Sequence, residues 1–227
     1  MTLCADKYRV REYVAEKAGP EILNEFYAVY ERVDEINFDN LPDAFALKVN
    51  HHSGGNVFCR DKAQLNRSAA RKKLKTFLDH DHYIGAREWA YKNIPRRIIC
   101  EKYLEENGKP PIDYKFFCFH GEPLFIQVNM DRFEKHHRNC YDLQWNLQPF
   151  TLSHPNCEFI VEKPSRLDEM VKIAKKLSAD FPFVRVDMYC IEGKVLFGEM
   201  TFYPGGGGEC FSPESYDELW GAKLHLR

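Results

Sequence analysis

The sequence lacks long apolar runs, an excess of charge of one sign, repeats and low-complexity segments. No apolar stretch approaches the roughly 20 residues that a membrane-spanning helix needs. The 32 Lys and Arg residues are balanced by 34 Asp and Glu residues, which gives a formal net charge of −2. A chain of this kind has no basic field for nucleic acid or an anionic membrane. We therefore expect neither a membrane span nor a nucleic-acid partner.

The sequence also lacks closely spaced cysteine pairs. Eight cysteines are present, but no two have the CxxC spacing of a zinc knuckle or a thioredoxin-type motif. Several stand in apolar runs, such as Cys100 after two isoleucines and Cys118 between two phenylalanines. We expect buried thiols in a reducing compartment, with disulfides as the alternative that the even count leaves open. Residues 1–14 are charged and contain no signal-peptide core, so we expect a cytoplasmic protein.

The apolar periodicity predicts helices mixed with antiparallel hairpins. Helical spacing of apolar residues predicts helices at residues 6–17, 61–78 and 165–180. Strands are predicted at residues 44–49, 98–104, 114–119, 124–129, 183–190 and 194–201, the last four forming two hairpins. The fold class is therefore α+β. The polar, aromatic segment 130–160 is expected to be a long functional loop without regular structure.

The last predicted hairpin has the strongest pattern of chemically active residues. Alternation along a strand places Arg185 with Asp187 on one face, and Glu199 with Thr201 on one face. Pairing the two strands would bring two carboxylates and a guanidinium together. Carboxylates that close repel each other unless a cation lies between them, and oxygen ligands suit Mg²⁺. The alternative is an exposed, salt-bridged face of a two-stranded ribbon, which alternation alone does not exclude.

Three further segments are weaker signals for nucleotide binding. Lys48 precedes a small polar loop at residues 50–56, whose backbone N–H groups could hold phosphates, although the Walker A spacing is absent. The predicted strand 98–104 runs into Glu105 and Glu106, a pattern suited to an adenine edge and ribose hydroxyls. The four glycines at residues 205–208 allow close backbone approach, although a simple hinge would have the same composition.

Two other clusters of polar residues have ordinary explanations. His51 and His52 are adjacent and diverge on a strand, which makes them a poor metal pair. The sequence Asp-His-Asp-His at residues 79–82 is interpreted as a solvated loop, with a metal cluster as the less favoured alternative. The basic residues at positions 71–75 are interpreted as a solvated helix face, with an anionic substrate as the less favoured alternative.

Taken together and in this order, these segments resemble the ATP-grasp superfamily. The last hairpin resembles the metal-binding hairpin of D-alanine–D-alanine ligases. More specifically, the chain looks like the TupA-like ATP-grasp family of bacterial surface-polysaccharide gene clusters, through residues 5–14, 47–51, 113–119 and 180–187. The resemblance covers nearly the whole chain. It implies one ATP-grasp unit over residues 1–227, with antiparallel sheets in two α+β lobes (1–104 and 105–227) that grip ATP between them.

The resemblance also implies ligands for ATP and Mg²⁺. Arg185 would stabilise the transferring phosphoryl group, and Asp187, Glu199 and Thr201 would bind Mg²⁺, although many relatives have Asn in place of this Thr. The residues implied to bind ATP are Lys48, His51, Ser53, Gly54, Glu101, Lys102, Tyr103, Leu104, Glu106 and Lys115. His52 stands where a phosphate loop is expected to have Gly. The candidates for binding the substrate are Gln127, Asp131, Arg132, His136, Arg138 and Gly206.

The activity implied by the resemblance is ATP-dependent amide formation between a carboxylate and an amine, through an acyl phosphate. The expected carboxylate is a uronic acid in a capsular or teichuronic-type polysaccharide or its UDP-sugar precursor. The expected amine is an amino acid or a small amino alcohol. The alternatives are a kinase-like phosphoryl transfer and a nucleotide-binding or glycosyltransferase-like accessory protein without turnover. Relatives carry more residues before the Asp-Lys-Tyr motif, so a partner domain would replace that leading lobe, or the lobe is not needed.

Overall fold

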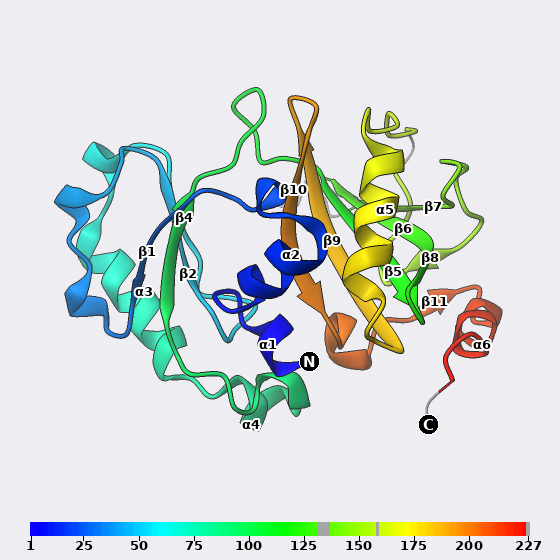
Figure 1. Cartoon of the computed structure of the whole chain (residues 1–227), viewed down its shortest axis with the longest axis horizontal. Coiled ribbons are helices and arrows are strands. Elements are labelled where there is room, and N and C mark those ends of the chain that lie inside the picture. The colour runs from blue at the N-terminus through cyan, green and yellow to red at the C-terminus, as the bar shows by residue number, and fades with distance from the viewer. Residues whose placement is uncertain (131–136, 158, 226–227) are drawn as a thin grey trace. The chain divides into compact units, whose positions relative to one another are not determined.

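The computed structural model describes residues 1–130, 137–157 and 159–225 (Figure 1). The chain divides into two compact units. Unit 1 consists of Met1–Ala15 and Leu23–Glu105, and unit 2 consists of Glu16–Ile22 and Glu106–Arg227. Each unit is built on its own antiparallel sheet.

Unit 1 is built on a four-stranded antiparallel sheet with the strand order β1-β4-β2-β3. Its strands are β1 (Phe26–Tyr30), β2 (Phe45–Val49), β3 (Val57–Cys59) and β4 (Ile98–Lys102). The helix α3 (Arg67–Asp79) packs along β2 and β3 (Figure 1). Leu74 and Leu78 of this helix share one buried cluster with Phe45 and Leu47 of β2. The shorter helices of this part are α1 (Thr2–Ala5), α2 (Val10–Ala18, which ends among unit 2 residues) and α4 (His82–Ala86).

Unit 2 is built on a five-stranded antiparallel sheet with the strand order β10-β9-β5-β6-β7. The strands are β5 (Asp113–Phe119), β6 (Glu122–Met130), β7 (His137–Tyr141), β9 (Phe183–Ile191) and β10 (Lys194–Thr201). Helix α5 (Leu167–Ser178) lies along β9, β5 and β6 (Figure 1). Phe117 of β5 and Phe125 of β6 belong to one hydrophobic cluster with Trp220 of α6 (Ser215–Gly221). A small sheet of β8 (Thr151–Leu152) and β11 (Phe211–Ser212) contributes to the same cluster.

A β-bulge determines which face the end of β10 presents. Phe197 lies opposite Met188, and Glu199 lies opposite Asp187, so that Gly198 has no partner of its own. A bulge of this kind shifts the side-chain alternation by one position. Before the bulge the odd-numbered residues of β10 are buried, whereas after it Met200 is buried. If the strands paired regularly with no bulge, Glu199 would lie on the face of Phe197, opposite to the face of Asp187.

The structure confirms the α+β class and most predicted elements. The two predicted hairpins are β5–β6 and β9–β10, and the helix predicted at 165–180 is α5. The prediction of a long irregular segment at 130–160 is wrong in part, because β7 and β8 lie in it. The helix predicted from residue 61 begins later, because Asn66 caps α3 by accepting from the Ala69 N–H at 2.9 Å. The strands β1 and β3 were not predicted.

The thiols follow the expectation of buried cysteines without disulfides. The eight cysteines, all within the described residues, form no disulfide, and six of them are buried. Within the described residues, no helix combines the length and apolar character that crossing a membrane requires.

The bulge gives a test of backbone packing. A Cβ at Gly198 would lie 3.0 Å from the backbone oxygen of Asp187. Gly198→Ala should therefore lower the free energy of unfolding by about 1–3 kcal/mol, measured by chemical denaturation. Gly221→Ala is the control, since a Cβ there meets nothing within 4 Å and Ala favours the helix. Equal stability of both variants would show that the bulge tolerates a side chain.

Candidate functional site

Charged side chains from three strands of unit 2 meet on one face of the sheet. The register places Asp187 of β9 opposite Lys115 of β5 and opposite Glu199 of β10. Arg185 donates from Nε to Asp187 Oδ1 at 2.7 Å and from Nη2 to Oδ2 at 2.8 Å. This two-point contact fixes the guanidinium plane, which is the advantage of Arg over Lys at such a position.

Lys115 completes the buried part of this cluster. Its ammonium group pairs with Asp187 and, at 2.8 Å, with Asp113 of the same strand. Burial lowers the pKa of Lys115, and the Asp187 carboxylate opposes that effect. Burial also disfavours the charged form of Arg185, but the Asp187 carboxylate outweighs it and raises the pKa of this guanidinium. The charged forms of Lys115 and Arg185 are therefore both stabilised by the Asp187 carboxylate.

The cluster opens to solvent at β10. Arg185 Nη2 also donates to Thr201 Oγ1 at 3.0 Å and to Glu199 Oε1 at 3.3 Å. Thr201 in turn donates to Glu199 Oε1 at 3.3 Å. The Glu199 side chain is 40% exposed, whereas that of Asp187 is only 2% exposed. The structure thus brings together all four residues predicted from the last hairpin, with a carboxylate at the accessible edge.

The predicted substrate residues continue the same face of the sheet. Gln127 of β6 lies opposite Lys115 and donates to Asn129 Oδ1 at 3.0 Å. Arg138 of β7 lies opposite Asn129 and forms an ion pair with Glu209. Gly206 lies in the exposed run of four glycines that precedes Glu209, and its φ is positive, at 65°. Asp131, Arg132 and His136 lie outside the described residues.

In unit 1, Lys48 is held by a carboxylate from the neighbouring strand. Lys48 Nζ donates to Glu101 Oε2 at 2.9 Å, and Arg11 donates to Glu101 Oε1 at 3.2 Å. The Lys48 side chain is partly exposed, whereas Glu101 is buried. The Glu101 side chain therefore serves as the counter-ion of two cations.

Packing against α3 leaves no room for side chains at two positions of the loop after β2. A Cβ at Gly54 would lie 2.7 Å from Phe77, and one at Gly55 would lie 2.6 Å from it. The side chain of His51 is buried, with Nε2 3.1 Å from the backbone oxygen of His80. Ser53 is exposed. The structure therefore places Ser53 and Gly54 in a turn that packs against Phe77 of α3, while the preceding His51 is buried.

The last residue of β4 and the segment after it contain the remaining predicted nucleotide contacts. Lys102 is exposed, while Tyr103 is half-buried and its hydroxyl accepts from Arg60 Nε at 2.7 Å. Leu104 is half-buried. Glu106 belongs to unit 2, where its carboxylate accepts from the backbone N–H of Glu192 at 3.3 Å. Glu106 thereby supports the tip of the β9–β10 hairpin.

A cluster of histidines lies beside the Ser53–Gly54 turn. The ring of His52 lies 4.6 Å from that of His82 and 5.4 Å from that of His80, measured between centroids. His52 Nδ1 accepts from the Gly54 N–H at 2.8 Å. The interpretation of residues 79–82 as a solvated loop is therefore wrong for His82, whose side chain is only 11% exposed. Within the described residues, no group of three or more His, Cys, Asp or Glu side chains is arranged to hold a metal ion by itself.

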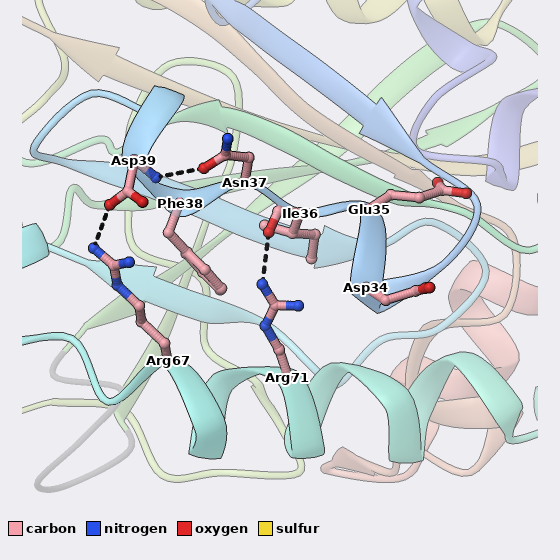
Figure 2. Close-up of a pocket in the computed structure, with 8 residues that line it drawn as sticks. All are labelled: Asp34, Glu35, Ile36, Asn37, Phe38, Asp39, Arg67 and Arg71. Atoms are coloured by element: carbon pink, nitrogen blue, oxygen red, sulfur yellow. Dashed lines mark hydrogen bonds and ion pairs between the residues drawn. The ribbon is translucent and has the colours of Figure 1, made fainter.

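A surface pocket of unit 1 lies apart from the predicted residues. Its volume is about 330 Å³, and Figure 2 shows Phe38 between Arg67 and Arg71. Arg67 pairs with Asp39 at 2.7 Å, and Arg71 donates to the backbone oxygen of Ile36 at 2.8 Å. Because both guanidinium groups already donate hydrogen bonds within the protein, we assign no role to this pocket.

The antiparallel sheets and the charged β9–β10 hairpin agree with the ATP-grasp superfamily, to which the matching family model belongs. More specifically, the chain belongs to the TupA-like ATP-grasp family, whose model matches residues 1–225. No curated protein matches the sequence.

Solved structures of low identity share the fold. A D-alanine–D-alanine ligase from Bacillus anthracis is 19% identical, with a TM-score of 0.51 over 96% of this chain and 62% of that one. An L-amino acid ligase from Bacillus licheniformis is 12% identical, with a TM-score of 0.54 over 90% of this chain and 44% of that one. An N5-carboxyaminoimidazole ribonucleotide synthetase in its ADP complex is 11% identical, with a TM-score of 0.54 over 88% and 45%. The chain thus spans less than two thirds of each of these proteins.

Sequence reasoning missed three charged residues that pair with predicted site residues. Asp113 is the second counter-ion of Lys115; it lies two residues before Lys115 and directly before the predicted strand 114–119, which was a usable signal. Arg11 shares Glu101 with Lys48 across a separation of 90 residues, for which one sequence gives no signal. Glu209 directly follows the four glycines, and its pairing with Arg138 spans 71 residues.

Removing the ammonium group of Lys115 should destabilise the folded protein. Lys115→Met leaves Asp113 without this buried counter-ion, so the free energy of unfolding should fall by roughly 3–5 kcal/mol. Lys175→Met is the control, because its ion pair with Glu122 is largely exposed and should matter little. Urea denaturation of both variants checks this, and a similar small change in both would contradict the buried ion cluster.

The histidine cluster should make stability depend on pH. Burial, followed by the neighbouring His82 and His80, lowers the pKa of His52 from 6.5 to about 4. Between these two values the unfolded state binds more protons, so stability is present above pH 6.5 and is lost as the pH falls towards 4. His52→Asn keeps an acceptor for Gly54 and removes the titration, so its Tm should fall less steeply over this range. The control is His120→Asn, at an exposed position, whose Tm should depend on pH as that of the wild type does. Identical slopes of Tm against pH for all three proteins would refute the assignment of this pH dependence to His52.

Proposed function

We propose that this protein is an ATP-dependent carboxylate–amine ligase. The observation that carries the proposal is the cluster of Arg185, Asp187, Glu199 and Lys115 on one face of the unit 2 sheet. Membership of the TupA-like ATP-grasp family supports it. The likeness to solved ligases supports the fold on which the proposal depends.

The proposed first step transfers the γ-phosphoryl group of ATP to a substrate carboxylate, giving an acyl phosphate and ADP. Such a transfer is helped mainly by positioning and by positive charge near the phosphoryl oxygens. Arg185 and Lys115 are held in place before ATP arrives, so little reorganisation is needed when charge develops. In unit 1, Lys48 and the backbone of the Ser53–Gly54 turn would contribute to nucleotide phosphate binding. Lys102, Tyr103 and Leu104 would line the adenine.

The donor set of β9 and β10 fits Mg²⁺. Glu199 and Thr201 offer oxygen ligands at the exposed edge, and Asp187 offers a carboxylate behind them. Mg²⁺ is usually held by one or two carboxylates together with substrate phosphates, which agrees with so small a set of protein ligands. When bound, Mg²⁺ would neutralise phosphate charge. Asp187 and Glu199 would hold it, while Arg185 would turn part of its contacts towards the phosphoryl group.

In the second step an amine displaces phosphate from the acyl phosphate and forms an amide. We propose a uronic acid of a surface polysaccharide, or its nucleotide-sugar precursor, as the carboxylate substrate. This choice rests on the resemblance of the chain to the TupA-like family of bacterial surface-polysaccharide gene clusters. The polar face from Lys115 to Arg138, with Gln127 and Asn129 between them, supplies the hydrogen-bonding groups that a sugar ring requires.

Neutralising Glu199 tests the proposal. Glu199→Gln should lower the rate of ADP release from Mg-ATP, in the presence of a uronic acid and an amine, by about a hundredfold or more. Its Tm should stay close to wild type because the side chain is partly exposed. Glu122→Gln, an exposed carboxylate of the same sheet, should keep full activity. Retained turnover in the Glu199 variant would contradict the assignment, and nucleotide binding without ADP release by wild type would favour an accessory protein.

A further inference from the structure

The Ser53–Gly54 turn of unit 1 is preceded by a histidine that already holds one of its backbone N–H groups. Nδ1 of His52 accepts a hydrogen bond from the Gly54 N–H at 2.8 Å. A ring nitrogen accepts a hydrogen bond only when it carries no proton, so this contact requires an unprotonated Nδ1. The contact also uses a backbone N–H that the turn could otherwise donate to a phosphate oxygen.

The ring of His52 lies among rings from the end of α3 and the start of α4. Its centroid is 4.6 Å from that of His82 and 5.4 Å from that of His80. The ring of Phe77 lies 4.9 Å away in an edge-on contact. Two of these three neighbours can become cations and none is an anion, so the surroundings oppose a positive charge on His52.

Two further groups near His52 carry or can take a positive charge. Lys7, between α1 and α2, donates from Nζ to the backbone oxygen of His52 at 2.8 Å. His51 directly precedes His52, and its Nε2 lies 3.1 Å from the backbone oxygen of His80. The cluster therefore gathers one lysine and four histidines around the turn.

The cluster is correspondingly short of negative charge. The carboxylates of the surrounding segments are paired elsewhere: Glu88 with His82, Asp81 with Arg96, and Asp79 with Lys75. In the part of the chain that the structure describes, no carboxylate forms a hydrogen bond or an ion pair with the His52 ring. Burial, followed by the neighbouring His82 and His80, lowers the pKa of His52 to about 4. The ring is therefore neutral at pH 7 in the free protein.

A phosphate group at the turn would supply the missing anion. An opposite charge at close range favours the protonated form of a histidine. His52 is half-buried and Ser53 is exposed, so both solvent protons and a ligand can reach this side of the turn. Binding of an anion and binding of a proton should therefore each promote the other at this position.

We propose that His52 couples nucleotide binding to the uptake of one proton. This proposal rests on the proposed function. When the nucleotide phosphates reach the turn, the Gly54 N–H leaves His52 Nδ1 and donates to a phosphate oxygen. Nδ1 takes a proton from solvent, and the imidazolium that results pairs with the phosphate. No covalent bond between heavy atoms is made or broken.

The other histidines of the cluster are less suited to this role. The carboxylate of Glu88 already lies 3.3 Å from His82 Nε2, so the charge of His82 does not depend on a phosphate. His51 is buried, and its Nε2 is engaged by a backbone oxygen. Only His52 contacts an N–H of the turn itself among the hydrogen bonds of these rings.

The direction of the pH dependence follows from the linkage. Below the pKa of His52 in the complex, the affinity for Mg-ATP rises as the pH falls, because the complex binds one more proton than the free protein. For one proton the rise is at most about tenfold per pH unit. The rise ends near pH 4, where His52 of the free protein is itself protonated.

Calorimetric titration of the full chain with Mg-ATP, in two buffers of different ionisation enthalpy, tests the proposal. The dependence of the observed enthalpy on the buffer counts the protons taken up. At pH 6 the wild type should take up about one proton more than His52→Asn and bind about tenfold more tightly, whereas at pH 8.5 both should bind alike. The titration of ATP itself cancels, because both proteins meet the same ligand. His120→Asn, at an exposed position of unit 2, is the control and should match the wild type.

The outcomes separate this proposal from the proposed function. Equal proton uptake by the wild type and His52→Asn, with Mg-ATP bound by both, would overturn the coupling and leave the proposed function standing. Absence of Mg-ATP binding by the wild type at both pH values would contradict the proposed function, and the coupling with it. If His52→Asn does not fold, NMR of the wild type replaces it. The Cε1–H signal of His52 should move to the imidazolium position when Mg-ATP is added at pH 6, and an unmoved signal would overturn the coupling.

Discussion

The neutralisation of two buried cations is the constraint on which the unit 2 site depends. Arg185 and Lys115 are held in the interior of the sheet, and Asp187 is the carboxylate that they share. Burying a charge is unfavourable unless it is paired and hydrogen-bonded. The positions of Asp113, Glu199 and Thr201 follow from this need, because each contacts one of the two cations. A cluster of this kind is rigid before any ligand binds.

Backbone geometry decides whether these side chains meet at all. The tight turn at Glu192 and Gly193 sets the register of the β9–β10 hairpin, and the bulge at Gly198 then shifts it. The shift lets the apolar side chain of Phe197 and the carboxylate of Glu199 point to opposite faces. Unit 1 uses a simpler arrangement, since Lys48 and Glu101 meet across two directly paired strands. In both units a cation suited to phosphate is held by a carboxylate of the protein.

Much of the fold and part of the site follow from local sequence patterns. Alternation in β9 and β10 predicted the shared face of Arg185 and Asp187, because side chains on a strand repeat every two residues. The bulge at Gly198 could not be inferred in this way, because residues 195–197 are all apolar and the change from odd to even buried positions is seen only in the structure. The pairing of Arg138 with Glu209 could not be inferred either, because it depends on how segments 71 residues apart pack together. The same holds for the contact of His52 with His82, which local patterns interpreted as solvated.

We expect the charged clusters of the two units to bind Mg-ATP, and thermal unfolding of the full chain would reveal that binding. Ligand that binds only the folded state stabilises it by about 2.7 kcal/mol at a concentration of 100 Kd. We predict that Mg-ATP raises the Tm by several degrees, that ATP with EDTA raises it less, and that Mg-GTP has little effect. An unchanged Tm with Mg-ATP at millimolar concentration, for a protein that unfolds cooperatively, would contradict the account.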